Sequence, residues 1–328
     1  MRIGIVSPNP TLNSGGVERF CHTLRASLSG LGASAEVLGA AEAADFAADL
    51  VITNGMVGRP MPIARVHVYH GCWVEHVRHS HREASLHWRA RFLAKGVARE
   101  IRAGRRAYRV AVSDSAAHEV RRWYGYRVHR VVPNGVDTAE FAPGDRARAR
   151  RELGISPSER VALFIGRPET RKRPDIAVAA AARAGYRLYL AGSGSVPGAV
   201  SLGVQSPAAL AGWVRAADCV LAPSEYEACS IAILEAFSAG TPVVASRVGW
   251  IETLLQHVPG YVGLTSPRGD VEGFTAALDG LATTAHAVPA AVSYVRTHNS
   301  LEAFGKQWAA VVEDVLRRRQ KTPIIGTP

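Results

Sequence analysis

The sequence lacks several features that would assign it to a class of protein at once. It has only four cysteines, and none of them shows the spacing of zinc ligands: Cys21, Cys72, Cys219 and Cys229. We therefore expect four small, buried side chains rather than a metal or redox centre. No Asp-x-Asp metal motif occurs either, so no bound metal is expected.

Long apolar runs are also absent. No stretch of 18 or more uncharged apolar residues occurs, so no segment is expected to span a membrane. The N-terminus, "MRIGIVSP", is typical of a strand and lacks the apolar stretch and cleavage site of a signal peptide. The expected location is therefore cytoplasmic.

Acidic residues are scarce relative to basic ones. The 39 lysines and arginines outnumber the 28 acids, which gives a formal net charge of +11. Such a balance attracts anions, whether nucleotides, nucleic acid or an anionic membrane face. No recognised nucleic-acid motif accompanies the charge, so we expect no nucleic-acid partner.

What is present is a regular alternation of two patterns. Short β-rich runs alternate with helical patterns, which is typical of parallel sheets with helices on both faces. Strands are expected at 2–8, 34–39, 49–54, 65–71, 108–114, 128–134, 160–166, 187–192, 219–224, 242–248 and 261–266. Helices are expected at 17–31, 83–107, 115–124, 175–184, 207–217, 230–239, 251–257, 271–282 and 301–319. The two series predict an α/β fold with two Rossmann-like domains.

The join between the two series is the polar segment 137–153, which contains Pro143–Gly144 and then opens a basic helix. The predicted boundaries are 1–143 for the amino-terminal domain, 144–300 for the carboxy-terminal domain and 301–328 for a last helix with its tail. The segment 283–298 before that helix is poorly patterned.

A phosphate site is predicted where the strand "CVLAPS" ends. Ligands of open α/β sheets bind beyond the carboxyl ends of the strands. Ser230 is a plausible N-cap of the helix that follows, and Gly240 a plausible stop. The backbone amides of Cys229, Ser230 and Ile231 would then point outward, ready to bind a phosphate.

Two glutamates flank this predicted site. Glu227 precedes it in the loop, and Glu235 lies one turn past Ile231 on the same helical face. A carboxylate repels a phosphate but accepts a good hydrogen bond from a sugar hydroxyl. The arrangement suits a diphosphate with hydroxyl groups on both sides, as in a nucleotide sugar. On the glutamates alone, an acidic half-helix that complements its own dipole is an equal alternative.

The segment "E-x7-E" followed by "EAFSAGTPVVAS" resembles the donor-site signature of the retaining glycosyltransferases of family 4, which have the GT-B fold. Other segments resemble motifs of that family in the same order: "SGGVERF" (14–20) the amino-terminal glycine loop, "VVPNGVDTAEFAP" (131–143) the end of the first domain, "FIGRPETRKRPD" (164–175) the basic pair, and "RLYLAGSG" (187–194) the next strand and turn. The resemblance spans nearly the whole chain. It implies two Rossmann-like domains with parallel sheets facing across a cleft.

The resemblance also implies an activity. Family members of this kind move a sugar, with retention and without a metal, from a nucleotide sugar to a hydroxyl acceptor. A UDP-sugar is favoured and a GDP-sugar comes next, while the acceptor is a lipid, a glycan or a small natural product. The amino-terminal domain would hold the acceptor, the carboxy-terminal domain the donor, and the last helix would cross back to the first domain. The nucleotide sugar is a substrate, so no cofactor is expected. The chain departs from the family at 228–230, where "ACS" replaces a glycine-rich turn.

Roles for individual residues follow from the same resemblance. Arg167 and Lys172 would stabilise the leaving diphosphate, Glu227 would hold the transferred sugar, and His70 would lie near it. The expected donor-binding set is Gly15, Gly16, Gly166, Val204, Ala228, Cys229, Ser230, Ile231 and Glu235. Without the resemblance, a solvated basic loop is the preferred interpretation of the basic pair, and a structural role that of a lone histidine. The two consecutive glycines would then be an ordinary strand-to-helix turn.

Other functions remain as alternatives. One is a phosphorylase-like enzyme on the same fold, and another is a non-catalytic module that binds nucleotide sugars or a membrane surface. The basic stretch 82–109 is preferred as a core-facing helix with a solvated face, with docking to an anionic inner membrane face as the alternative. The loop "GSGSVPG" (192–198) weakly resembles a dinucleotide fingerprint, but a strand-like segment follows where a helix should begin.

Overall fold

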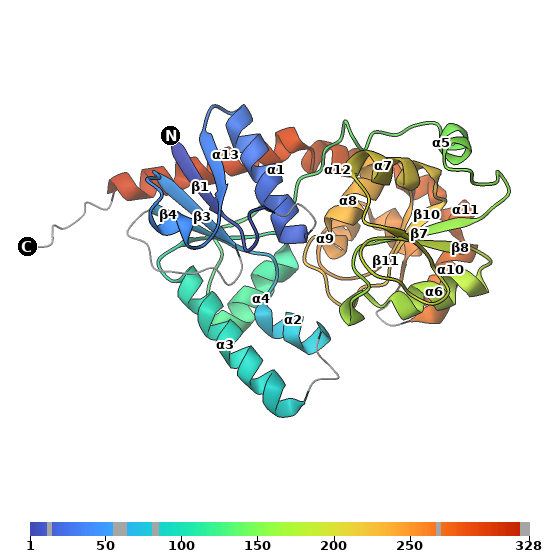
Figure 1. Ribbon diagram of the computed structural model, residues 1–328, viewed down its shortest axis with the longest axis horizontal. Coiled ribbons are helices and arrows are strands. Elements are labelled where there is room, and N and C mark those ends of the chain that lie inside the picture. Colours follow the sequence, from blue (N-terminus) through green and yellow to red (C-terminus); the bar gives the residue numbers. More distant parts are fainter. Residues whose placement is uncertain (12–14, 55–63, 81–84, 267–269, 322–328) are drawn as a thin grey trace, which may run out of the picture. The chain divides into compact units, whose positions relative to one another are not determined.

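The computed structural model describes residues 1–11, 15–54, 64–80, 85–266 and 270–321 (Figure 1). The chain forms two compact units. The first comprises Met1–Val77, Glu83–Asn134 and the chain from Leu301 onward, and the second comprises Gly135–Ser300 with Arg78–Arg82.

The first unit contains a sheet whose described strands all run parallel, in the order β2-β1-β3-β4-β5-β6. They are β1 (Arg2–Val6), β2 (Ser34–Leu38), β3 (Leu50–Asn54), β4 (Ala64–Tyr69), β5 (Tyr108–Ala111) and β6 (Arg130–Val131). Every residue of β3 is buried, as expected for a parallel strand covered on both faces. The order reverses between β1 and β3, which places the topological switch point of this sheet beside β1.

Helices cover this sheet: α1 (Gly16–Gly30), α2 (Trp73–Ser80), α3 (Leu86–Gly104), α4 (Asp114–Tyr124), the short η1 (Glu42–Ala44) and α13 (Leu301–Lys321). The last helix packs on the first, where the ring of Phe20 meets Phe304 and Trp308 edge-on at 5.8 and 5.9 Å. The Asp314 carboxylate binds the Tyr108 hydroxyl at 3.0 Å. None of the helices in the described part of the chain is long and apolar enough to cross a bilayer.

The second unit repeats the plan with the strand order β12-β11-β10-β7-β8-β9. Its parallel strands are β7 (Val161–Ile165), β8 (Arg187–Ala191), β9 (Val200–Gly203), β10 (Cys219–Ala222), β11 (Val243–Ser246) and β12 (Thr265–Ser266). Strands β7 and β10 are neighbours, with Val220 beside Leu163. The strand order reverses between them, so this pair marks the switch point of the sheet.

The second unit's helices are α5 (Arg146–Glu152), α6 (Pro174–Arg183), α7 (Pro207–Ala216), α8 (Ile231–Ser238), α9 (Trp250–His257), α10 (Val271–Asp279), α11 (Leu281–Thr284) and α12 (Val288–His298). Three short 3₁₀ helices accompany them: η2 (Thr170–Lys172), η3 (Pro259–Leu264) and η4 (Ala285–Ala287). The predicted α/β class with two parallel sheets is confirmed.

Several elements differ from the sequence prediction. Helix α2 was not expected, since only two buried valines, Val74 and Val77, mark its inner face. Helix α12 occupies most of the poorly patterned stretch because its buried face is partly alanine, which weakens the hydrophobic period. Most of the strand expected at 261–266 is the 3₁₀ helix η3. There the Tyr261 hydroxyl bonds both the N–H and the C=O of Val243 at 2.8 Å.

Helix α3 is fixed to α2 through a glycine and a buried acid. The Trp73 indole N–H donates to the Phe92 carbonyl at 3.1 Å, and the ring covers Gly96 so closely that a Cβ there would overlap it. Farther along, Glu100 is buried and its Oε2 accepts from the Trp73 backbone N–H at 3.0 Å and from the Tyr124 hydroxyl. These bonds set the position of α2 on α3.

We expect Gly96→Ala to lower the free energy of unfolding by about 2 kcal/mol, because the added methyl must displace the bound indole ring. Gly212→Ala in α7 is the matched control, since nothing lies within 4 Å of its Cβ position. There the better helix former should be neutral or stabilising by up to about 1 kcal/mol. Urea denaturation of both variants measures the difference, and equal effects would contradict the assigned packing.

Burial raises the pKa of Glu100 from 4.5 to about 7, and the two hydrogen bonds only partly oppose it. Between pH 4.5 and pH 7 the folded state therefore keeps a proton on Glu100 that the unfolded state loses. The free energy of unfolding is highest below about pH 4.5 and falls as the pH rises through 7. Glu100→Gln has no carboxyl group to titrate, so this pH dependence disappears. Between pH 5 and pH 8 its free energy of unfolding should rise by about 1–3 kcal/mol relative to that of the native protein. Urea denaturation across this range tests it, and a constant difference would refute it.

Candidate functional site

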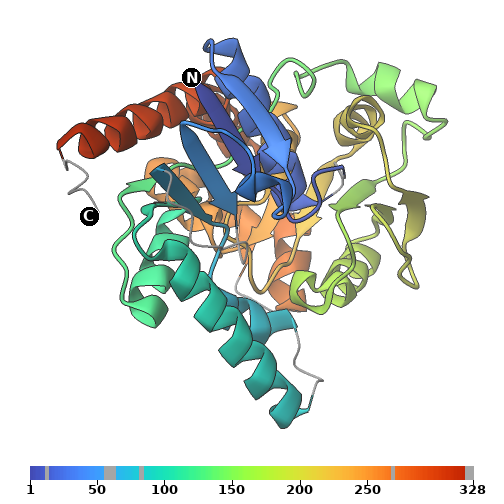
Figure 2. The same ribbon diagram turned by 60° about the vertical axis from the view of Figure 1, so that its left-hand side comes forward.

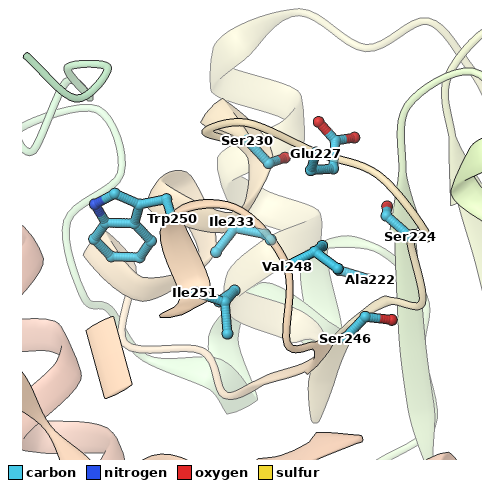
Figure 3. Close-up of a pocket in the computed structure, with 9 residues that line it drawn as sticks. All are labelled: Ala222, Ser224, Glu227, Ser230, Ile233, Ser246, Val248, Trp250 and Ile251. Atoms are coloured by element: carbon cyan, nitrogen blue, oxygen red, sulfur yellow. The ribbon is translucent and has the colours of Figure 1, made fainter. Parts of the chain in front are cut away.

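An open hollow lies at the switch point of the second unit's sheet. Its lining comes from the ends of β10 and β11, the loop after β10 and the first turns of α8 and α9 (Figure 3). It is lined by Ala222, Ser224, Glu227, Ser230, Ile233, Ser246, Val248, Trp250 and Ile251. An adjoining hollow shares Ser224 and Ser230 and adds Lys172 and the end of β7.

The loop after β7 carries the predicted basic pair. Gly166 adopts a φ of +122°, and the Lys172 ammonium lies 3.2 Å from where its Cβ would be. Gly192 packs against the Gly166 carbonyl with no room for a side chain. Because neither glycine has a side chain, their backbones lie close together, and Lys172 can fold back over the end of β7.

Glu227 joins this loop to the one after β10. Its Oε1 accepts from Lys172 Nζ at 2.8 Å and from the Arg171 guanidinium at 3.0 Å. All three side chains are largely shielded from solvent, with exposed fractions of 16 to 17%. Arg171 also donates to the Tyr226 carbonyl at 3.1 Å, and its own carbonyl accepts from the Glu225 N–H at 2.7 Å.

The charge state of Glu227 is set by these two cations. Burial by itself would raise the pKa of this carboxyl, but Lys172 and Arg171 outweigh it and lower the pKa to about 2. The carboxylate therefore stays ionised at every physiological pH. No described residue bonds its second oxygen, Oε2, which leaves that atom able to accept from a ligand hydroxyl.

The first turn of α8 faces the same hollow. Ser230 is the N-cap, as predicted, but its side chain makes no capping hydrogen bond. The helix begins at Ile231, and its first intrahelical bond is donated by Leu234 to the Ser230 carbonyl. The amides at the positions just before Leu234 are the ones that a helix start leaves for an anion. Gly240, with a φ of +82°, follows the end of the helix as predicted.

Helix α9 closes the other side of the hollow. Gly249 adopts a φ of +60° and lies against the Glu227 and Ala228 carbonyls, with no room for a Cβ. The Trp250 N–H then donates to the Ala228 carbonyl at 2.8 Å. The loop carrying Glu227 is thus bonded to the start of α9 and to the loop after β7. Deeper in, the Ser246 hydroxyl is buried without a hydrogen-bond partner among the described residues.

The remaining predicted donor residues are placed in different surroundings. Ala228 and Cys229 are buried in the loop, and Glu235 lies in α8 at 1% exposure. Val204 follows β9 and is 65% exposed. Arg167 is 64% exposed, and its one ion-pair partner within the described part of the chain is Glu169, at 3.6 Å. Arg167 is therefore the accessible member of the predicted pair, whereas Lys172 is already engaged by Glu227.

His70 lies in the first unit, directly after β4. Its ring packs edge-on against Phe20 at 4.6 Å, and its Nε2 lies 3.0 Å from Asn54 Oδ1. The Asn54 amide nitrogen donates to the Val6 carbonyl at 3.0 Å, so its oxygen faces the histidine. Nε2 therefore carries the hydrogen and donates it. Burial lowers the pKa of His70 to about 4, which keeps the ring neutral with Nδ1 as an acceptor.

The predicted glycine loop precedes α1 at the switch point of the first sheet. Gly15 is the N-cap and Gly16 the first helical residue, while Ser14 lies outside the described residues. The Glu18 carboxylate lies over Gly15 and accepts from the Asn9 amide at 3.2 Å. At the start of a helix this negative charge is favourable.

Sequence reasoning missed Arg171 in the site. The sequence analysis assigns Arg171 no role, yet it is largely shielded from solvent and shares the Glu227 carboxylate with Lys172. Lys172 and Arg171 are adjacent in sequence, and the 3₁₀ turn η2 is what directs both toward one acid. The available signal was two adjacent cations in one loop and a glutamate in another, but no helical or strand period predicts the turn that brings them together.

Two family models match the chain in sequence order. Residues 41–140 match the model described as Glycosyltransferase Family 4, and residues 159–284 match the one described as Glycosyl transferases group 1. Each model corresponds mainly to one of the two units.

The curated relatives include two D-inositol 3-phosphate glycosyltransferases. That of Kribbella flavida is 36% identical over 204 residues, which cover 53% of this chain and 48% of that protein. That of Segniliparus rotundus is 44% identical over 142 residues, which cover 36% of this chain and 32% of that protein. The chain thus spans about a third to a half of the length of these relatives.

Solved structures share the fold along almost the whole chain. Sucrose-phosphate synthase of Thermosynechococcus elongatus has a TM-score of 0.82 at 20% identity, covering 97% of this chain and 99% of that one. HepE of Anabaena, solved with UDP-glucose, has a TM-score of 0.76 at 18% identity, covering 96% and 100%. Given the two ordered family matches and this common architecture, the chain belongs to glycosyltransferase family 4 and has the GT-B fold.

Proposed function

We propose that the protein transfers a sugar from a nucleotide sugar to a hydroxyl acceptor. The observation that carries the proposal is the cluster of Lys172, Arg171 and Glu227 at the switch point of the second unit's sheet, beside the start of α8. This is where open α/β sheets bind their ligands. Glu169 also pairs with Arg171 at 2.9 Å and lies 3.6 Å from Arg167, so these loops hold three cations for two carboxylates, which leaves a net positive charge beside a helix N-terminus.

That charge pattern suits a diphosphate. The amides at the start of α8 and the dipole of the helix attract a phosphate, and the cations add charge-assisted hydrogen bonds. Glu227 fits a different part of the ligand. Its free oxygen can only accept a hydrogen bond, so it selects a sugar hydroxyl over a phosphate oxygen. One ligand that satisfies both is a sugar joined to a nucleoside diphosphate.

The same groups would act on the leaving group. When the bond between sugar and diphosphate breaks, negative charge grows on the phosphate oxygens. Lys172 and the amides at the start of α8 are fixed donors for that charge, and the exposed Arg167 adds a further cation. We propose that they act without a divalent metal and that the anomeric configuration is retained, as the family resemblance implies. The leaving phosphate would then accept the proton of the attacking hydroxyl.

UDP is the favoured nucleotide, with GDP next. HepE was solved with UDP and with UDP-glucose, which supports a UDP-sugar for this chain at the level of the common fold. The names of the curated relatives describe glycosyl transfer to an inositol phosphate. For this chain the acceptor class is a hydroxyl of a lipid, a glycan or a small natural product, and the first unit would bind it.

A nucleotide panel tests the donor. We expect UDP to raise the melting temperature more than GDP, and inorganic phosphate to change it little. At 100 times Kd a ligand adds about 2.7 kcal/mol to the stability, which is easily measured by differential scanning fluorimetry. UDP-glucose should also be hydrolysed slowly, and EDTA should not abolish this. If phosphate alone stabilises the protein and no nucleotide does, a phosphorylase-like enzyme replaces the proposal.

Lys172→Ala should lower kcat for the UDP-sugar at least tenfold, about 1.4 kcal/mol or more in the barrier, because the leaving diphosphate loses a fixed cation. Arg183→Ala is the matched control. It removes one cation from the same unit, but Arg183 is exposed and, among the residues that the structure describes, pairs only with Glu272 in α10. The control should keep native kcat. A Lys172→Ala protein with native thermal stability and undiminished turnover would refute the role of Lys172.

A further inference from the structure

Arg173 has a backbone conformation that few side chains adopt. Its φ is +49° and its ψ is 56°, in the left-handed region. In the described part of the chain, Arg106 is the one other non-glycine residue with a positive φ. The residue after Arg173 is Pro174, and a proline disfavours any but an extended conformation in the residue before it. Two separate rules thus disfavour this backbone, and strain of this kind is common at functional sites.

The strained residue joins two elements of the second unit. Arg173 ends η2, where its N–H donates to the Thr170 carbonyl at 3.1 Å, and its own carbonyl accepts from the Ile176 N–H at 3.1 Å in α6. Helix α6, yellow-green in Figures 1 and 2, packs on β8 and α10 with Ile176 fully buried. Because the core of the unit fixes α6, the backbone of Arg173 decides the direction of η2, whose last residue is Lys172.

Ion pairs of the side chain oppose this strain. The Arg173 guanidinium bonds both oxygens of Asp175, with Nη2 2.7 Å from Oδ2, and its Nη1 lies 2.7 Å from Glu225 Oε1. The Asp175 side chain is 61% exposed, so water weakens that pair. The Glu225 side chain is only 6% exposed, so its pair with Arg173 is shielded from solvent. The second oxygen of Glu225 lies 3.4 Å from Nδ1 of His79, a residue of the same unit.

Glu225 connects Arg173 to the loop that carries Glu227. The Glu225 N–H donates to the Arg171 carbonyl at 2.7 Å, while its carboxylate pairs with Arg173. Between these two contacts lies Lys172, whose ammonium is 2.8 Å from Glu227 Oε1. The loop after β10 therefore holds the residue on each side of Lys172 as well as Lys172 itself.

We propose that Arg173 is a positioning residue for Lys172. The left-handed backbone of Arg173, held by its ion pairs, directs Lys172 toward the end of β7, where the ammonium lies over Gly166. If this backbone relaxed to an extended conformation, η2 would turn and Lys172 would move away from Gly166 and Glu227. Arg173 acts through Lys172 and needs no contact with the donor. The inference rests on the proposed sugar transfer, in which Lys172 meets the leaving diphosphate.

A pair of substitutions separates the backbone of Arg173 from its charge. Arg173→Ala keeps the strain but loses the ion pairs, so kcat for UDP-glucose should fall about tenfold, with KM changed less than about threefold. Arg173→Gly loses the same guanidinium, but glycine adopts the left-handed conformation without strain, so kcat should stay within about threefold of native. Both variants leave Glu225 without this cation, so any effect of that carboxylate is common to them. Equal losses of kcat in the two variants would overturn the proposal.

A double-mutant cycle tests whether Arg173 acts through Lys172. In the Lys172→Ala background, Arg173→Ala should lower kcat by less than about twofold, because the ammonium that Arg173 positions is already gone. A further tenfold loss in that background would show that Arg173 acts independently, as a direct contact with the donor would, and the assignment would fall.

Arg106 is the matched control for strain alone. Its φ is +57°, and it is an exposed residue of the first unit, in the turn after α3. Arg106→Gly should have a higher melting temperature than Arg106→Ala, because glycine relieves the strain, but both should keep native kcat. If the two Arg106 variants differ in kcat as much as the two Arg173 variants do, general destabilisation replaces positioning as the explanation.

Amide hydrogen exchange adds a readout that needs no turnover. The Lys172 N–H donates to the Glu169 carbonyl at 2.8 Å, and the Ile176 N–H donates to the carbonyl of residue 173. Both amides should exchange several-fold faster in Arg173→Ala than in the native protein, and at the native rate in Arg106→Ala. A native protein that turns over no nucleotide sugar would refute the proposed function. Unchanged exchange in Arg173→Ala would separately refute the hold of Arg173 on the turn.

Discussion

The ion pairs of Glu227 with Lys172 and Arg171 connect the two loops that the switch point brings together. One loop follows β7 and the other follows β10, and these strands are neighbours although more than 50 residues separate them in sequence. A largely shielded carboxylate that pairs with two largely shielded cations is destabilised when one partner is removed, because an unpaired charge stays behind. The cluster therefore holds the loops in register before any ligand arrives. Gly166 and Gly249 make this possible by letting the backbone approach without side chains.

The basic residues of the chain differ in whether an acid pairs with them. Arg150 is buried, pairs with Asp218 at 2.9 Å and donates to several carbonyl groups, so its charge serves the packing of the second unit. Lys172 and Arg171 are neutralised in part by Glu227. Four exposed cations of α3 have no such partner among the described residues: Arg91, Lys95, Arg99 and Arg102. The net charge of +11 is thus a poor guide to function until the paired cations are set aside.

The alternation of strands and helices was enough to predict two parallel sheets, because buried parallel strands such as β3 are apolar runs that the sequence displays directly. The helix start at Ser230 and its stop at Gly240 followed from capping preferences, which act over a few residues. Arg171 could not be assigned in this way. Its role depends on a 3₁₀ turn and on a loop from a distant strand, and neither leaves a periodic pattern. The tautomer of His70 was equally hidden, because Asn54 and Val6 fix it from two other strands.

The first unit draws on both ends of the chain, since Phe304 and Trp308 of α13 cover the ring of Phe20 in α1. During synthesis the residues of α1 leave the ribosome long before those of α13. The second unit, nearly continuous from Gly135 to Ser300, is complete in the meantime. The order of folding therefore differs from the order of synthesis. The second unit can fold first, while the first unit keeps an apolar face of α1 uncovered until α13 has been synthesised. A nascent chain in this interval is a natural client for chaperones.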